Sequence, residues 1–221
     1  MNALQRLRLT FARGEETKYI SHLDLMRLWE RALCRAGLPL SYSSGHTPHA
    51  KISLAAPLAV GVTSEAELVD IVLERRISPL HFMRSLEKQL PKGIDVPEVQ
   101  EVGLGVPSLQ SQVRFAEYTV TLETHHTPEE VQNSVKHLLA LESLPWQHAR
   151  DKEVRHYDLR TLIDDIWLED WREGCAVLGM RLQTDPTGTG RPEQVAMALA
   201  LCGDEPPTSI HRTRLVLADE R

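Results

Sequence analysis

Apolar and polar residues alternate at the start of the chain. In residues 5–12, Leu7, Leu9 and Phe11 are separated by arginine or threonine. A period of two predicts a strand with one buried face and one polar face.

A helical period follows in residues 21–36. Ser21 has Asp24 three residues later, a capping box in which Asp replaces Glu, and apolar residues then recur on one face. Gly37 and Pro39 end the helix. We therefore expect a helix with one apolar face and one charged face.

The rest of the first half predicts strands at 51–57, 67–73 and 94–102 and a helix at 78–90. The order strand, helix, strand, strand, helix, strand is that of a ferredoxin-like domain. We assign this domain to residues 1–103 and a linker to residues 104–110, which include Gly105 and Pro107.

Residues 111–221 repeat this order with an additional hairpin. The predicted elements are strands 114–123, 146–150, 153–157, 165–171, 175–184 and 210–217, helices 127–141 and 191–201, and a helical turn at 158–163. The sequence thus predicts the α+β class, with two ferredoxin-like halves and a hairpin inserted in the second.

Composition is that of an ordinary soluble protein, with 42% apolar and 25% charged residues among 221. No run of eighteen apolar residues occurs, and the amino terminus lacks the apolar core of a signal peptide. The three cysteines are far apart in sequence and odd in number. We expect a cytoplasmic protein with reduced thiols.

The net charge of −6 is unevenly distributed. Residues 1–60 carry eight Lys or Arg against four acids, a net charge of +4, so the remainder carries −10. A basic segment can bind nucleic acid even in an acidic protein, because the local electrostatic field and not the net charge attracts the phosphates. Chance unevenness of solvated charge explains the pattern equally well.

Two polar segments could form an anion site if the fold brings them together. They contain Tyr19, Ser21, His22 and Asp24 at the helix start, and His46, His49 and Lys51 in a loop. A helix start supplies free backbone N–H groups, and Lys51 adds a positive charge. The histidines and Asp24 are also adequate metal ligands, although we expect no metal. Helix capping and surface polarity are the remaining explanation.

Arg27, Arg31 and Arg35 recur every four residues on the polar side of the same helix. Guanidinium groups in a row can follow phosphates, since arginine pairs with phosphate through two hydrogen bonds. A solvated helix face is the alternative.

A further polar set lies near the carboxyl end of the chain. It comprises His156, Asp158, Arg160, Gly188, Gly190, Arg191, His211 and Arg212. A glycine-rich loop that opens a helix can bind an anion through its amides. It can equally be a flexible connection.

Several common motifs are absent from the sequence. It has no Gly-x4-Gly-Lys-Ser/Thr loop, no dinucleotide fingerprint, no Cys-x-x-Cys pair and no Gly-x-Ser-x-Gly elbow. These absences argue against several nucleotide-dependent, zinc, redox and hydrolase classes, and we expect no cofactor.

The chain resembles a bacterial domain-of-unknown-function family that is associated with radical SAM enzymes. The resemblance rests on Tyr-Ile-Ser-His-Leu-Asp-Leu-Met-Arg at 19–27, Arg-Ala-Gly-Leu-Pro at 35–39 and Tyr-Ser-x-Gly-His-x-Pro-His-x-Lys-x-Ser at 42–53. It extends to 158–160, 190–192 and 210–213. Such a domain follows or accompanies a radical SAM module, and genes of the family often lie near RNA-processing functions.

This chain has no Cys-x3-Cys-x2-Cys to hold an iron–sulfur cluster. The resemblance therefore implies a separate radical SAM partner. The preferred hypothesis is an accessory protein that presents RNA to that partner. Its proposed RNA contacts are Ser21, His22, Tyr42, Ser43, His46, Lys51 and Ser53, extended by the three helical arginines.

Two other functions are compatible with the same residues. The first is an RNA-cleaving or RNA-modifying enzyme in which His22 or His46 is the general base and Lys51 stabilises charge. The second is an adaptor that binds only protein, in which the polar motifs are structural.

Overall fold

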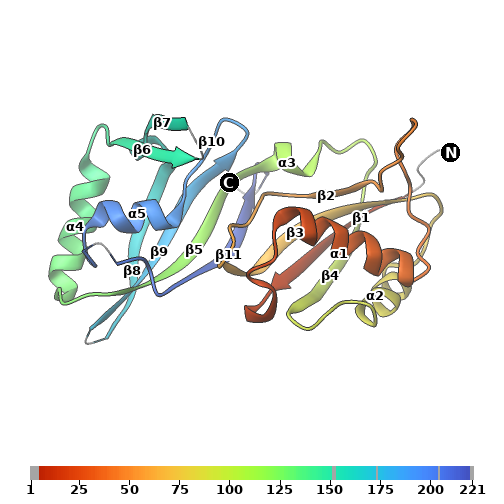
Figure 1. Ribbon diagram of the computed structural model, residues 1–221, viewed down its shortest axis with the longest axis horizontal. Coiled ribbons are helices and arrows are strands. Elements are labelled where there is room, and N and C mark those ends of the chain that lie inside the picture. Colours follow the sequence, from red (N-terminus) through yellow and green to blue (C-terminus); the bar gives the residue numbers. More distant parts are fainter. Residues whose placement is uncertain (1–4, 151–152, 173, 204, 220–221) are drawn as a thin grey trace. The chain divides into compact units, whose positions relative to one another are not determined.

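A computed structural model describes residues 5–150, 153–172, 174–203 and 205–219. The chain divides into two compact units, Met1–Val113 and Arg114–Arg221. Each unit combines helices with antiparallel strands, so the predicted α+β class is confirmed (Figure 1).

Unit 1 has the predicted alternation of strands and helices. Its elements are β1 (Gln5–Arg13), the 3-10 turn η1 (Glu15–Thr17), α1 (His22–Arg35), β2 (Ile52–Leu54), β3 (Thr63–Leu73), α2 (Pro79–Glu87), β4 (Ile94–Val102) and α3 (Leu109–Gln112).

Two strands of unit 1 differ in length from the prediction. β2 stops at Leu54 rather than at residue 57, where Pro57 has no N–H to continue a ladder. β3 begins at Thr63 rather than at residue 67, because Ser64 still pairs with Arg13 of β1. The polar start of β3 concealed this extension in the sequence.

The strands of unit 1 are ordered β2-β3-β1-β4, and each neighbouring pair is antiparallel. Leu9 of β1 lies opposite Val69 of β3 on one side and Val99 of β4 on the other. Side chains at directly opposed positions share a face of the sheet, so this register gathers the alternating apolar residues on one face.

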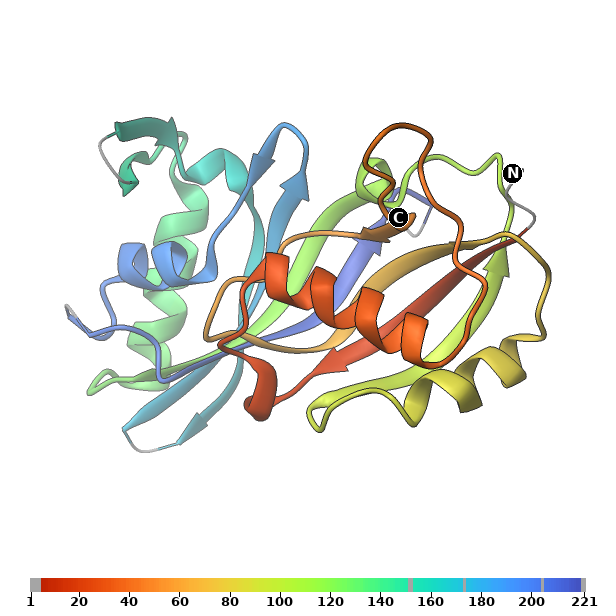
Figure 2. The same cartoon turned by 45° about the vertical axis from the view of Figure 1, so that its right-hand side comes forward.

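Helices α1 and α2 cover that apolar face (Figure 2). Trp29 of α1 and Phe82 of α2 are fully buried there. The ring of Trp29 meets Phe11 of β1 edge-on, with centroids 5.0 Å apart and planes at 74°, a favourable aromatic geometry. The helices therefore pack on the apolar face of the sheet that the alternating sequence pattern predicted.

The opposite face of the sheet carries a buried ionic cluster. The carboxylate of Asp70 accepts from Arg8 Nε at 2.8 Å, Arg8 Nη2 at 3.1 Å and Arg6 Nε at 2.9 Å, and also from Arg6 Nη2. All three residues are buried, and Asp70 is only 2% exposed. One carboxylate thus compensates two guanidinium groups.

The segment predicted as a linker packs against this cluster. Arg6 donates to the carbonyls of Val106 at 2.7 Å and Pro107 at 3.0 Å, and Leu109 of α3 is fully buried.

Unit 2 contains the predicted hairpin between its first helix and its second long strand. Its elements are β5 (Val113–Glu123), α4 (Pro128–Ala140), β6 (Pro145–Arg150), β7 (Glu153–Asp158), the 3-10 turn η2 (Arg160–Leu162), β8 (Ile163–Arg172), β9 (Cys175–Asp185), β10 (Gly188–Thr189), α5 (Pro192–Leu199) and β11 (Ser209–Leu217).

The long strands of unit 2 follow the same order as those of unit 1. β8 pairs with β9, β9 with β5, and β5 with β11, while the β6–β7 hairpin forms a separate two-stranded ladder. Gly179 of β9 lies opposite Trp167 of β8, and a Cβ at Gly179 would lie 2.0 Å from the indole ring. The sheet needs glycine there because the ring occupies that space.

Among the described residues, none of the helices has the length and apolar character needed to cross a membrane.

Replacing Asp70 by Asn should destabilise the protein strongly. The change leaves two buried guanidinium groups without a counter-charge, which typically costs about 3–5 kcal/mol of unfolding free energy. Urea unfolding would measure this loss, and Asp95→Asn, an exposed site on β4, should stay within about 0.5 kcal/mol. A loss for Asp70→Asn that matches this control would contradict the structural role of the cluster.

Gly179→Ala should lower the melting temperature of unit 2. The added methyl group overlaps the Trp167 ring, and such overpacking typically costs about 1–3 kcal/mol. The matched control is Gly105→Ala, where a Cβ meets nothing within 4 Å. Equal thermal unfolding of the two variants would contradict the predicted clash.

Candidate anion-binding cleft on helix α1

The three helical arginines line one cleft. It measures about 460 Å³, and its other wall is the segment that follows α2, at Gln89, Leu90 and Pro91. The arginines reach this side because Leu25, Trp29, Ala32 and Leu33 turn the apolar stripe of α1 into the core. The structure thus gathers Arg27, Arg31 and Arg35 at one surface hollow, together with Asp24.

The arginines of this cleft differ in how their guanidinium groups are engaged. Arg35 Nη2 donates to the carbonyl of Gln89 at 3.1 Å, and Arg27 Nη1 donates to Asp24 Oδ1 at 3.1 Å. The guanidinium group of Arg31 forms no hydrogen bond or ion pair with any residue that the structure describes. Three guanidinium groups against the single carboxylate of Asp24 leave the cleft positive, with Arg31 available to an anion.

The start of α1 holds Asp24 in its ionised form. The backbone N–H of Asp24 donates to Ser21 Oγ at 3.1 Å, and Ser21 Oγ donates to Asp24 Oδ2 at 2.8 Å. The Ser21 hydrogen bond, followed by that from Arg27, lowers the pKa of Asp24 below its ordinary value. Ser21 therefore caps the helix, and Tyr19 and His22 beside it are exposed.

The polar loop at residues 41–50 does not meet the start of α1. Tyr42 Oη lies 3.7 Å from Cys34 Sγ, in the last turn of the helix. A helix of 14 residues is about 20 Å long, so this contact puts the loop at the far end. The expected convergence of His22 with His46 is not found, because the chain after α1 returns to the sheet beside the helix end.

The loop is closed by its own backbone. The N–H of Ser43 donates to the carbonyl of His49, the N–H of His49 donates to Ser43 Oγ, and His46 is exposed between them. Lys51 and Ser53 line a different cleft, next to Arg6 and Asp70. Of the residues named by the enzyme hypothesis, Lys51 lines this cleft, and neither His22 nor His46 does.

The glycine-rich loop of unit 2 is already occupied by a carboxylate of the chain itself. Asp185 Oδ1 accepts from the N–H of Thr187 at 2.7 Å and that of Gly188 at 3.1 Å. A Cβ at Gly188 or Gly190 would lie within 3 Å of Leu162. These glycines allow close packing, and the amides expected to bind an external anion bind Asp185 instead.

The other polar residues of unit 2 do not gather around this loop. Arg160 donates to the carbonyls of Leu139 and Ile163, Arg191 lies 3.9 Å from Glu193, and Arg212 on β11 is fully buried. His156 is exposed on β7 and His211 is partly buried on β11. Asp158 accepts from the N–H groups of Leu144 and Arg160, which fixes the turn before η2.

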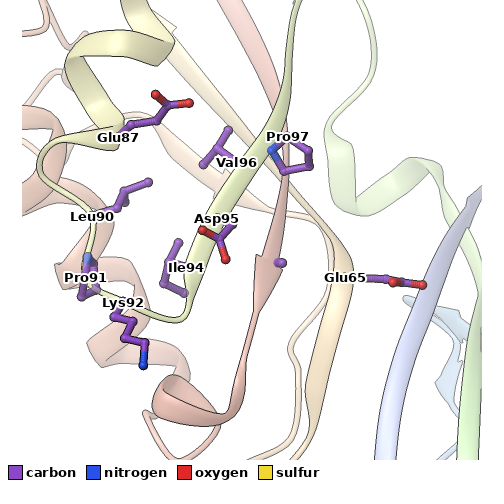
Figure 3. Close-up of a pocket in the computed structure, with 10 residues that line it drawn as sticks. Glu65, Glu87, Leu90, Pro91, Lys92, Ile94, Asp95, Val96 and Pro97 are labelled. Carbon is purple, nitrogen blue, oxygen red and sulfur yellow. The ribbon is translucent and has the colours of Figure 1, made fainter.

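A second hollow beside the arginine cleft has the opposite charge. It measures about 740 Å³ and carries the carboxylates of Glu87 and Asp95, with Leu90 and Pro91 in its wall (Figure 3). Lys92 at its edge is paired with Glu16 at 2.8 Å. Because Leu90 and Pro91 also line the arginine cleft, they separate a negative hollow from a positive one.

The described part of the chain contains no cluster of three or more potential metal ligands drawn from His, Cys, Asp and Glu. Cys34, Cys175 and Cys202 are free thiols.

Residues 6–192 match the sequence profile of a family described as "Uncharacterized protein conserved in bacteria (DUF2344)". The chain belongs to this family. No curated protein matches it. A chain of the "Crystal Structure of a Cbf5-Nop10-Gar1 Complex" shares its fold at a TM-score of 0.52 and 11% identity, over 96% of this chain and 49% of that one.

A second solved structure, "Structure of H/ACA RNP bound to a substrate RNA containing 2'-deoxyuridine", aligns at a TM-score of 0.49 and 11% identity, over 96% of this chain and 47% of that one. This chain therefore spans about half the length of both matched chains. At these identities the likeness concerns the fold alone.

Sequence reasoning identified one wall of the arginine cleft and missed the other. The helical spacing placed the arginines on one side, but Gln89, Leu90 and Pro91 are an ordinary helix end followed by a breaker. Only the packing of α2 beside α1 brings that segment to the arginines. The cleft beside Arg6 was likewise missed, because its parts lie far apart in sequence.

Ser21→Ala should raise the pKa of Asp24 towards its ordinary value, since the Ser21 hydrogen bond is the main cause of its depression. A lowered pKa in the folded state stabilises the fold above the pKa of the unfolded chain, and this contribution is lost as pH falls through the folded pKa. An NMR titration would measure the shift. Asp185, whose pKa is also lowered, should titrate unchanged in the variant, and an unmoved Asp24 would contradict the assignment.

Proposed function

We propose that this protein binds RNA through the arginine cleft of α1 and presents it to a separate radical SAM enzyme. The main support for RNA binding is the cleft itself, in which three arginines face Gln89, Leu90 and Pro91. The guanidinium group of Arg31 has no hydrogen bond or ion pair to the residues that the structure describes. Phosphate oxygens are the ligands that guanidinium groups pair with through two hydrogen bonds.

The spacing of the arginines suits a chain of phosphates better than a single anion. Arg27 and Arg35 are two helical turns apart, about 12 Å along the axis at 1.5 Å per residue. An extended polyanion can contact all three guanidinium groups, whereas one phosphate reaches only part of the row. The cleft is at the surface, where a strand can pass along the helix.

The proposed fold of each half is ferredoxin-like, with residues 1–103 and 111–221 as the two domains and 104–110 between them. The support is the strand order, second-third-first-fourth among the long strands, which both units share. Such sheets with helices on one face are a common framework for small binding domains.

The radical SAM part of the proposal rests on the sequence resemblance of residues 19–27 and 42–53. The chain has no cysteine triad for an iron–sulfur cluster. The radical SAM chemistry is therefore assigned to a partner, and the proposed role of these 221 residues is binding rather than chemistry. Neither His22 nor His46 lines the cleft that contains Lys51, which gives no support to an RNA-cleaving function.

Arg31→Gln should weaken RNA binding about tenfold, since it removes a charge-assisted contact. It should also lower the slope of log affinity against log salt by about 0.7, the loss of one phosphate contact on a single strand. Fluorescence anisotropy with a short labelled RNA would measure both quantities. Arg84→Gln, an exposed arginine of α2 outside the cleft, is the matched control.

Two results would overturn the proposal. The first is wild-type protein without salt-sensitive RNA affinity. The second is equal binding by Arg31→Gln and Arg84→Gln, which would show that general positive charge and not the cleft binds RNA.

A further inference from the structure

The cleft beside Arg6 is a second site in unit 1, and it measures about 430 Å³. Pockets for small organic ligands have volumes of about 300–1,000 Å³ and combine apolar walls with a few polar groups. Lys51, Ser53 and Ser108 supply the polar groups, and Arg6 and Asp70 form part of the wall. None of these groups belongs to the arginine cleft of α1.

The wall formed by Arg6 and Asp70 is electrostatically positive. A carboxylate offers about four lone-pair positions, and Asp70 already accepts four hydrogen bonds from Arg6 and Arg8. Oδ2 accepts three of these hydrogen bonds and Oδ1 accepts one, from Arg8 Nε, so both oxygens are bound to guanidinium groups. Two buried guanidinium groups against one carboxylate leave one positive charge, which acts strongly where water is excluded.

A second positive charge stands at the rim. Lys51 is exposed, and its ammonium group has no hydrogen bond or ion pair within the described ranges. The hydroxyl of Ser108 likewise makes no capping bond to α3. Ser53 Oγ is held by Gln110, whose Nε2 lies 2.7 Å away. Lys51 and Ser108 are thus the donors that remain for an anionic group.

The remaining lining is apolar. Val72 is partly buried on the same strand and face as Asp70, and Leu104 is 51% exposed although it lines the cleft. Ile52 also borders the cleft, but it lies opposite Ile71 and packs against the core on the other face of the sheet. A free inorganic anion would leave this surface in contact with water. An organic body attached to the anion would cover it, which is favourable in proportion to the apolar area removed from water.

We propose that this cleft binds a nucleoside monophosphate, with the phosphate at Lys51 and Ser108 and the base against Val72 and Leu104. The positive charge of the cleft favours a phosphate group, and its apolar wall favours the flat ring of a base. A free nucleotide and a nucleotide of an RNA strand share this chemistry. The inference does not depend on RNA binding at the arginine cleft.

Isothermal titration of the full chain with adenosine monophosphate, inorganic phosphate and a short oligoadenylate tests the proposal. Lys51→Gln should weaken adenosine monophosphate binding at least about fivefold, since an ionic hydrogen bond is lost. Leu104→Glu should weaken adenosine monophosphate binding more than Lys51→Gln does, because it places a carboxylate at the rim of the cleft. Lys136→Gln, an exposed lysine on α4, should bind as the wild type does.

The outcomes separate the alternatives. Lys51-dependent binding of oligoadenylate without binding of the free nucleotide would also support the site and identify RNA as the source. Binding that survives Lys51→Gln and Leu104→Glu, inorganic phosphate that binds as tightly as the nucleotide, or no binding of any probe would overturn it. Loss of nucleotide binding in Arg31→Gln would assign the ligand to the arginine cleft instead and would equally overturn it.

Discussion

The carboxylate of Asp70 is the contact on which the arrangement of unit 1 depends. It lies between Arg6 and Arg8 of β1, and all three side chains are removed from water. Two buried guanidinium groups are tolerated only with a counter-charge and filled hydrogen bonds. Asp70 supplies the charge, and the carbonyls of Val106 and Pro107 accept from two further N–H groups of Arg6. The same interaction therefore fixes the pairing of β1 with β3 and holds the segment before α3 against the sheet.

This cluster explains why unit 1 presents two different polar hollows. The helix face of the sheet is apolar, so α1 buries Leu25, Trp29 and Leu33 there and turns its arginines outward beside Gln89. The opposite face carries the ionic cluster, and a separate cleft beside it is lined by Lys51, just before β2, and by Ser53 within β2. A one-residue shift of β1 would exchange its apolar and ionic faces, so the register of that strand determines where both hollows form.

In the glycine-rich loop of unit 2, the backbone amides are hydrogen-bonded by a side chain of the same loop. Its amides do point at an anion, but the anion is Asp185, three residues before Gly188. Aspartate forms such local turns readily, since its side chain reaches the backbone two or three residues further on. Arg160 is similar, because its guanidinium donates to the carbonyls of Leu139 and Ile163. Residue types that suit ligand binding are here used to close turns.

The sequence by itself determined the elements that depend on local periodicity and capping. Alternation identified β1, and the spacing of apolar residues with Ser21 identified α1 and the outward row of arginines. Only the tertiary structure decided what those residues face. It placed Tyr42 at the end of α1 rather than at its start, brought Gln89 opposite Arg35, and joined Asp70 to Arg6 across 64 residues of chain. The physical reason is that periodicity reports which side of an element is buried, whereas the partner across a gap is set by strand register and packing, which no local pattern encodes.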